Sequence, residues 1–433
     1  MLYATVPESL QSNKIQPDDA AGHDWYRFVL SYPPHLVKYY LDRFDLSAGA
    51  SVLDPFSGTG TTVLEAVKNG YRGLGVEANP VAHLASTTKL DWKVDSSKLL
   101  RSAESIAKRL ERNFREAGIR DEDESTKEVN WFELKKLPPV SHKLLLKDSI
   151  NPVSLHKSLC LIELIQRTNL DIRNHLLVAA VTTIVNDVSN LKFGPEVGVR
   201  RVKSDKPILV PWLARVRRMA QDLTELKASD KTTEGKIVLG DARLVDTYFP
   251  KNSVDAIITS PPYPNEKDYS RTTRLENVLL GFVGNMQEQR KVKKRFVRSN
   301  TRSVYKDDQD HLFVKDIDSI QKVARKIEER RIELGKTSGF EKLYHKVTLQ
   351  YFGGMARHLA ACKTVLRPGS KLAYVVGDQA SYLRIMIRTG HLLAEVAESM
   401  GYTVDDIELF RTRFATRSKE ELREEVLILT YNG

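Results

Sequence analysis

The fold is decided by the stretch SVLDPFSGTGTTVLEA, residues 51–66, in which a short hydrophobic run ends in a carboxylate and a glycine-rich turn. Ala50–Leu53 has the pattern of a buried strand, and Thr62–Asn69 follows the turn with a helical pattern. Gly58 and Gly60 let the backbone turn tightly and approach a ligand without a Cβ in the way. A strand, a glycine turn and a helix in this order indicate the start of a parallel α/β sheet.

The alternation of strands and helices continues after this stretch and is then interrupted twice. Gly73–Glu77 has the pattern of a second strand, and Pro80–Lys89 that of a second helix. Residues from about 95 to 233 are mostly helical in pattern, and a second polar segment runs from about 270 to 340. Further strands are predicted at Lys236–Leu239, Val254–Thr259, Lys371–Val376, Val404–Phe410 and Val426–Tyr431, with a helix at His391–Met400.

These patterns predict one α/β domain, a doubly wound sheet, that is split by two mainly helical insertions. A sheet whose strands lie far apart in sequence can still be continuous in space. The predicted division is a flexible N-terminus at 1–22, core segments at 23–94, 236–282 and 345–433, a helical insertion at 95–235 and a basic insertion at 283–344.

The composition favours a polyanionic partner and argues against a membrane protein. The 433 residues include 67 Lys and Arg against 56 Asp and Glu, a formal net charge of +11. The most apolar stretch, Leu176–Val185, is ten residues long, against about 20 for a membrane-spanning helix. The N-terminus has no continuous apolar segment of the secretory kind, so we expect a cytoplasmic protein. Two cysteines and the spacing of the ten histidines predict neither a disulfide framework nor a metal site.

Two carboxylates close the first two predicted strands. The charge of Asp54 would repel a phosphate and suits a cationic or hydroxyl-rich ligand, whereas Glu77 is placed to accept both hydroxyls of a ribose. The glycine spacing fails the dinucleotide fingerprint, because the third glycine position is Val63. The glycines alone fit an ordinary turn between a strand and a helix equally well.

A second chemically informative stretch is VDAIITSPPYPNEKDY, residues 254–269, in which a buried strand runs into Ser260-Pro261-Pro262-Tyr263. Two successive prolines remove two N–H donors and stiffen the backbone, while their carbonyls stay free to accept. A planar amino group could donate to the Ser260 hydroxyl and the Pro261 carbonyl while its ring stacks on Tyr263. A proline-terminated loop without function is the weaker interpretation.

The sequences DPFSGTGTT and TSPPY together resemble motifs I and IV of the S-adenosylmethionine-dependent amino-methyltransferases that act on DNA bases. The Ser-Pro-Pro-Tyr form is more similar to the N4-cytosine branch than to the N6-adenine branch, in which Asp commonly stands first. The resemblance covers about 23–90, 236–282 and 345–431. It implies a Rossmann-like methyltransferase sheet, S-adenosylmethionine as the cofactor and double-stranded DNA as the substrate. A cognate restriction endonuclease, encoded separately, is a candidate partner.

The resemblance also implies roles for individual residues. Ser260, Pro261, Pro262 and Tyr263 would form the catalytic loop, and Tyr32-Pro33-Pro34 is loosely similar to a segment that caps the cofactor. The implied cofactor-binding residues are Asp54, Ser57, Thr61 and Thr62, with Phe56, Gly58 and Gly60 along the methionine part, Glu77 at the ribose and Asp241 near the adenine.

The expected chemistry agrees with these residue types. Methyl transfer from a sulfonium to an exocyclic amine needs no covalent enzyme intermediate, only orientation of the amine and polarisation of its N–H bonds. Methylation of cytosine at carbon 5 would need a nucleophilic cysteine, and neither Cys160 nor Cys362 lies near residues 260–263. An amine in duplex DNA becomes accessible when its base leaves the stack, and Tyr263 offers that base a stacking face.

The segment Arg290–Lys306 is the first candidate for DNA contact, because it holds eight basic residues and no acidic one. A merely solvated basic loop is the alternative. Arg200–Lys206 is a second basic segment, and which insertion recognises the target stays open. The candidate DNA-binding residues are Lys291, Lys293, Lys294, Arg295, Arg298 and Arg302.

Three other functions are compatible with the same motifs. The first is N6-methylation of adenine in DNA, the second is methylation of an RNA base or a protein amide, and the third is a module that only binds DNA or cofactor. Proteins that modify Gln also use a Pro-Pro-Tyr loop, usually with Asn first. Ser260 and the basic insertions favour duplex DNA, and the presence of Asp54, Ser260 and Tyr263 favours an enzyme.

Overall fold

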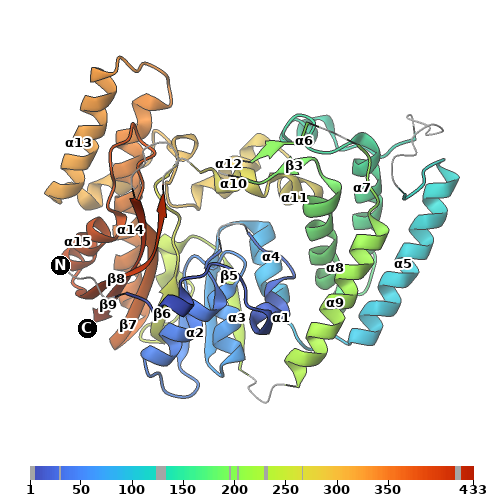
Figure 1. The fold of residues 1–433 in the computed structure, drawn as a ribbon, viewed down its shortest axis with the longest axis horizontal. Coiled ribbons are helices and arrows are strands. Elements are labelled where there is room, and N and C mark those ends of the chain that lie inside the picture. The colour runs from blue at the N-terminus through green and yellow to red at the C-terminus, as the bar shows by residue number, and fades with distance from the viewer. Residues whose placement is uncertain are drawn as a thin grey trace.

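The computed structural model describes residues 5–28, 31–122, 133–194, 197–201, 204–228, 233–265, 267–414 and 421–433. Its centre is a seven-stranded sheet with the strand order β5-β2-β1-β6-β7-β9-β8 (Figure 1). The strands are β1 (Ser51–Asp54), β2 (Arg72–Glu77), β5 (Gly235–Leu239), β6 (Val254–Thr259), β7 (Leu366–Gly377), β8 (Thr403–Phe414) and β9 (Glu421–Tyr431). The short strands β3 (Leu191–Lys192) and β4 (Gly198–Val199) form a separate antiparallel pair.

The sheet is parallel except at one edge. Strand β1 pairs in parallel with β2 and β6, and β5 and β7 extend the parallel part outwards. Strand β9 is antiparallel to both β7 and β8. The order of the parallel strands reverses between β1 and β6, and in such sheets ligands bind outside the carboxyl ends of the strands at this point.

Helices cover both faces of the sheet because neighbouring residues of each strand point to opposite sides. Val52 and Ile258 pack with α2 (Pro34–Arg43) and α3 (Thr61–Lys68), whereas Leu53 and Ile257 pack on the face covered by α14 (Tyr344–Val365) and α15 (Thr389–Ser399). Helix α4 (Pro80–Lys89) lies beside β2 and β5. The predicted doubly wound α/β fold is confirmed by this sheet order and its two helical layers.

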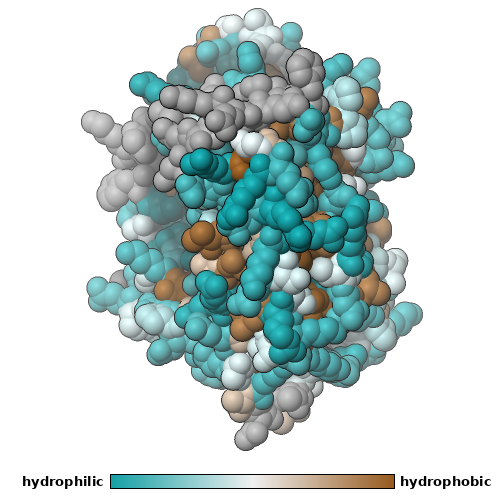
Figure 2. Space-filling view, turned by 90° about the vertical axis from the view of Figure 1, so that its right-hand side faces the viewer, coloured by the Kyte–Doolittle hydropathy of each residue, from teal (hydrophilic) through white to brown (hydrophobic). Residues whose placement is uncertain are grey.

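The first insertion forms a helical layer beyond α4, on the right of Figure 1. Its amphipathic helix α5 (Ser96–Glu116) buries Leu99, Ala103, Ile106 and Leu110 against the other helices, and Trp212 is fully buried among them. Figure 2 shows this side of the molecule, whose surface is mostly hydrophilic with scattered apolar spots. The helices are α5 (Ser96–Glu116), α6 (Pro139–His142), α7 (Pro152–Gln166), α8 (Leu170–Thr183) and α9 (Leu209–Lys227).

The second insertion connects β6 to α14 through short helices. Helix α13 (Asp318–Glu333) packs against α14 at the opposite end of the molecule from the first insertion (Figure 1). Gly335 follows α13 with a φ of +61°, so the Gly-Lys-Thr-Ser sequence there ends a helix. The remaining helices are α1 (Ala20–His23) near the N-terminus and, in this insertion, α10 (Tyr269–Thr272), α11 (Arg274–Leu279) and α12 (Met286–Lys294).

Most predicted elements match the structure within a few residues, but two features differ. Strand β7 begins at Leu366, and β8 and β9 are also longer than predicted, because the three strands pair along most of their length. The segment predicted as helical also contains the β3–β4 pair. The predicted domain boundaries stay a prediction. Among the described residues, no helix is both long enough and apolar enough to cross a membrane.

Candidate active site

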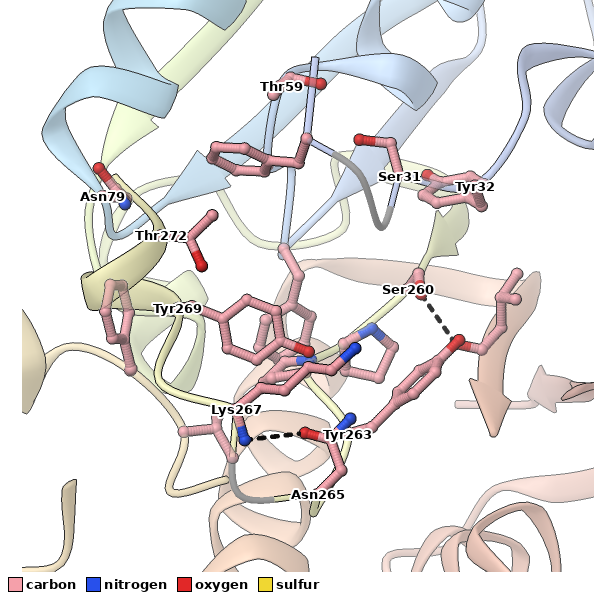
Figure 3. A pocket seen from close by; sticks show the side chains of 18 of the residues that line it. Ser31, Tyr32, Thr59, Asn79, Ser260, Tyr263, Asn265, Lys267, Tyr269 and Thr272 are labelled. Atoms are coloured by element: carbon pink, nitrogen blue, oxygen red, sulfur yellow. Dashed lines mark hydrogen bonds between the residues drawn. The ribbon is translucent and has the colours of Figure 1, made fainter. Parts of the chain in front are cut away.

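A cavity of about 270 Å³ opens at the carboxyl ends of β1 and β6, where the strand order reverses. The glycine turn after β1, the tip of β2 and the loop after β6 all contribute to its lining. Figure 3 shows Ser31, Tyr32 and Thr59 on one side of the cavity and Tyr263, Asn265 and Lys267 on the other. The two motifs singled out in the sequence therefore meet in one cavity.

The glycine turn is held against the tip of β2 by hydrogen bonds. The Gly58 amide donates to the Glu77 carboxylate at 2.7 Å, and the Ser57 amide donates to the Val76 carbonyl at 3.0 Å. Gly58 has a φ of +52°, and a Cβ built on it would meet no atom closer than the Phe56 carbonyl oxygen at 3.9 Å. Phe56, Ser57, Gly58 and Thr61 line the cavity, so the backbone at Gly58 faces open space.

Gly60 and Thr62, which the resemblance placed among the cofactor-binding residues, do not face the cavity. Gly60 has a φ of +86°, and a Cβ on it would lie 2.9 Å from the Cβ of Ser86 in α4. The Thr62 hydroxyl donates to the Ile258 carbonyl at 3.0 Å, inside the protein. Neither residue lines the cavity. Gly60 permits close packing of two helices, and Thr62 ties α3 to β6.

The Asp54 carboxylate is buried beneath the cavity and does not line it. It accepts hydrogen bonds from the Thr259 hydroxyl at 2.6 Å, the Phe56 amide at 3.0 Å and the Tyr32 hydroxyl at 3.1 Å. Burial raises the pKa of Asp54 to about 6, although these hydrogen bonds oppose the shift. Asp54 thus joins β1, β6 and the segment before α2. Because its carboxylate does not line the cavity, it can attract a ligand there only at a distance, across the residues that line the cavity.

The Glu77 carboxylate does line the cavity. Besides the bond from Gly58, it accepts a hydrogen bond from the Asn79 amide at 2.7 Å. Burial raises the pKa of Glu77 to about 7, and the charge of Asp54 adds to this effect. Each oxygen keeps a further lone pair, so the group can accept hydrogen bonds from a ligand in the cavity.

The loop after β6 is fixed by the neighbouring strands β7 and β9. The Ser260 hydroxyl donates to the Val375 carbonyl at 3.1 Å, and a second hydrogen bond joins it to the Tyr263 hydroxyl (Figure 3). A Cβ on Gly377 would lie 3.0 Å from the Tyr263 ring, so this glycine makes room for it. Burial, followed by the charge of Glu424, raises the pKa of Tyr263, which therefore stays neutral. Ser260, Pro261, Pro262 and Tyr263 all line the cavity.

Several cavity residues were not identified from the sequence. Tyr269 lies between the two sides of the cavity in Figure 3, and burial raises its pKa to about 12. Asn79 donates to the Thr273 hydroxyl at 2.6 Å and accepts from Asn277 at 3.1 Å, which ties the tip of β2 to α11. Tyr269 could have been expected near the cavity, because it stands only six residues after Tyr263 in the sequence. The contacts of Asn79 join residues almost 200 positions apart and leave no local pattern.

Asp241 lies outside the cavity lining. Its carboxylate accepts from the Arg243 amide and Nε, both at 2.9 Å, and from Arg243 Nη2 at 2.7 Å. Arg243 also contacts Asp310 in the second insertion at 2.5 Å. In this structure Asp241 caps a short helix and pairs with a buried arginine, while its neighbour Ala242 lines the cavity.

The six candidate DNA-binding residues fall into two groups. Lys293, Lys294 and Arg298 form ion pairs with Asp268, Asp307 and Asp308, at 2.7, 2.5 and 2.7 Å respectively. Lys291, Arg295 and Arg302 have no carboxylate partner within the described ranges, and of these Arg295 and Arg302 line the cavity. In the second basic segment, Val202 and Lys203 lie outside the described residues.

No protein-family model matches the chain. The chain is 24% identical to the type II methyltransferase M.BsoBI of Geobacillus stearothermophilus over 443 aligned residues, which cover 95% of this chain and 84% of the relative. The identity and coverage are the same for the type II methyltransferase M.AvaI of Anabaena variabilis. The type II methyltransferase M.MjaII of Methanocaldococcus jannaschii is 32% identical over 77 residues, 18% of this chain and 14% of the relative.

Among solved structures, TrmN from Thermus thermophilus aligns with 92% of this chain and 48% of its own chain, at 11% identity and a TM-score of 0.29. That score carries no weight beside the sheet order itself. The sequence similarity, in contrast, extends over nearly the whole chain, insertions included. The resemblance to methyltransferases that the two motifs indicated is therefore confirmed, and this chain is similar to the type II methyltransferases as a group.

Proposed function

We propose that this protein is an S-adenosylmethionine-dependent DNA methyltransferase that methylates the N4 amine of cytosine in double-stranded DNA. The observation that carries the proposal is that the Ser260–Tyr263 loop and the Gly58–Glu77 pair line one cavity at the point where the strand order reverses. One half of this cavity suits a hydroxyl-bearing cofactor, and the other half suits a planar amine.

The residues of the first half fit S-adenosylmethionine, which would supply an electrophilic methyl group. The ionised Glu77 carboxylate carries acceptors only, which matches the two hydroxyls of a ribose. A Cβ on Gly58 would project into the open cavity, so the absence of a side chain leaves room for a ligand against the backbone. Phe56 and Tyr32 supply apolar surface beside it.

The residues of the second half would hold the amine. The Ser260 hydroxyl donates to Val375 and is also bonded to the Tyr263 hydroxyl, so its one remaining lone pair and the Pro261 carbonyl can accept the two N–H bonds of an amine. Drawing electron density from these N–H bonds makes the nitrogen a better nucleophile. Tyr263 and Tyr269 would provide aromatic faces for a base that has left the DNA stack.

The positions of the two cysteines favour amine over carbon methylation. Cys362 is fully buried in α14, where burial raises the pKa of its thiol far above neutrality. Cys160 is buried in α7, in the helical insertion. Neither lines the cavity. The thiolate that attack on a cytosine ring would need is therefore not supplied by this chain.

Duplex DNA as the substrate is supported by the net charge of +11 and by basic side chains at the cavity. The similarity to type II methyltransferases also suggests a cognate restriction endonuclease as a separate partner.

Mass spectrometry of nucleosides tests the proposal. Genomic DNA that lacks methylated bases is incubated with the protein and S-adenosylmethionine carrying a deuterated methyl group, then digested to nucleosides. Labelled N4-methylcytosine is expected. Labelled N6-methyladenine would show that the target base is adenine and not cytosine, with methylation still at an amine. Labelled 5-methylcytosine, or label confined to RNA or protein, would overturn the proposal. A Tyr263→Ala variant prepared in parallel controls for contaminating enzymes.

A further inference from the structure

The basic segment Arg290–Lys306 contains cations that are already neutralised. Lys293 contacts the buried Asp268 at 2.7 Å. Burial alone would raise the pKa of Asp268, but the charge and hydrogen bond of Lys293, together with Ser270 and Arg274, lower it. Arg298 is 4% exposed at its side chain and makes two hydrogen bonds to Asp308, at 2.9 and 2.7 Å. Because each of these cations is paired with its own carboxylate, little net positive charge remains at either side chain to attract a phosphate.

The carboxylates that line the cavity are also compensated. Glu77 accepts two backbone N–H groups, Asp268 pairs with Lys293, and Glu424 pairs with Arg411 and Arg413. No acidic side chain of the described cavity lining therefore remains available to Arg295 or Arg302.

Arg295 and Arg302 stand apart from their neighbours. Both line the cavity, and no carboxylate of the described residues lies within ion-pair distance of either. The Arg302 guanidinium is exposed and lies 5.5 Å from the centre of the Phe340 ring, itself 53% exposed. A ring face holds a guanidinium without using up its N–H donors, which stay free for an anion.

We propose that Arg295 and Arg302 bind the DNA phosphates that flank the target nucleotide, and that the paired cations Lys293, Lys294 and Arg298 instead hold the segment in shape. The inference rests on the proposed function for the identity of the polyanion. A base that enters the cavity brings its flanking phosphates to the same cavity, and both arginines line it. A planar guanidinium with five donors matches the geometry of a phosphate.

A charge-matched pair of variants tests this. Arg295→Ala/Arg302→Ala removes two cations from the cavity, and Lys306→Ala/Arg325→Ala removes two exposed cations of the same insertion that do not line it. Binding of a fluorescein-labelled, mixed-sequence DNA duplex is measured by anisotropy between about 50 and 200 mM salt. The slope of log affinity against log salt is expected to fall by about two in the arginine variant and to stay near wild type in the control.

Equal losses in the two variants would overturn the inference, because a general loss of positive charge would then explain both. An unchanged slope in the arginine variant would overturn it as well. Calorimetric titration with S-adenosylhomocysteine checks that the cofactor half of the site is intact in each variant. Failure of the proposed function can be distinguished from failure of this inference. If only the proposed function fails, the wild-type protein binds the duplex with the expected slope but transfers no labelled methyl group to DNA.

Discussion

The loops that follow β1 and β6 end neighbouring strands of one sheet, but they are built from different chemistry. The first lies against two buried carboxylates, Asp54 at the end of β1 and Glu77 at the end of β2, which accept hydrogen bonds from backbone N–H groups and hydroxyls. The second uses Ser260, two prolines and Tyr263, which are neutral and are held by β7 and β9. Charge is thus concentrated in the half that we assign to the cofactor, and stacking surface in the half that we assign to the base.

This difference indicates how each half tolerates change. The first loop depends on the absence of a side chain at Gly58 and on the ionisation of a carboxylate, so it is sensitive to bulk and to pH. The second depends on one hydroxyl, whose loss leaves the surrounding rings in place. Variants in the first loop should change cofactor affinity, and variants in the second should change turnover.

The largest effect is expected from Gly58→Val. The φ of +52° strains any β-branched residue, and the new side chain would occupy the cavity. Overfilling a formed site costs up to about 3 kcal/mol, so affinity for S-adenosylhomocysteine should fall by up to about 10²-fold, with turnover lost. Titration calorimetry measures the binding.

Gly49→Val is the matched control, because Gly49 has a φ of +76° and no atom within 4 Å of a built Cβ. Both variants should lose similar stability in thermal unfolding, and only Gly58→Val should lose cofactor binding. Equal binding by the two variants would contradict the place we give to the glycine turn.

A smaller effect, confined to turnover, is expected from Ser260→Ala. Removing one hydrogen bond that organises charge in the transition state costs on the order of 10²-fold in kcat, by analogy with oxyanion-hole donors. Affinity for S-adenosylhomocysteine should stay near wild type, because Ser260 belongs to the second loop. Steady-state kinetics with labelled cofactor separates kcat from KM.

Ser370→Ala controls for the structural part of this loss. Ser370 is buried at the other end of the same strand pair, where its hydroxyl bonds the Val254 carbonyl at 3.0 Å, much as Ser260 bonds Val375. If both variants lose turnover equally, Ser260 has only a structural role and the division between the two loops fails.

The sequence was sufficient to predict what depends on local pattern. The strands that carry both loops are short apolar runs closed by turn residues, and the roles that we propose for Gly58 and Ser260 rest on their places after those runs. The sheet order could be expected because parallel strands with helical crossovers have few possible arrangements. The loop after β6 could therefore be expected near the glycine turn.

What escaped prediction depends on contacts between distant residues. Lys293 and Arg295 look alike in sequence, yet one pairs with Asp268 and the other lines the cavity. Asp241 pairs with Arg243, and the same guanidinium also contacts Asp310, which is 67 residues further along the chain. The ion-pair partner of a charged side chain is set by the folded structure, and the sequence pattern does not show it.

The smallest predicted effect is a pH dependence that belongs to the first loop alone. Burial raises the pKa of Glu77 to about 7, above the usual value near 4.3 for an unfolded chain. Because the folded pKa is the higher one, the contribution of this group to stability is complete below about pH 4 and is lost as the pH rises through about 7. Acidification from pH 8 to 6 should therefore not reduce the stability that Glu77 contributes to the ligand-free protein.

Cofactor binding should change in the opposite direction. The ionised carboxylate is the better acceptor for ribose hydroxyls, so affinity for S-adenosylhomocysteine should fall below pH 7, by up to about tenfold per pH unit. Glu77→Gln, which cannot ionise, should bind more weakly at pH 8 and show a flatter profile. Calorimetric titrations at pH 6, 7 and 8 measure both profiles. A wild-type profile as flat as that of Glu77→Gln would mean that Glu77 does not contact the cofactor, and that the charge in the first loop serves only to hold the turn.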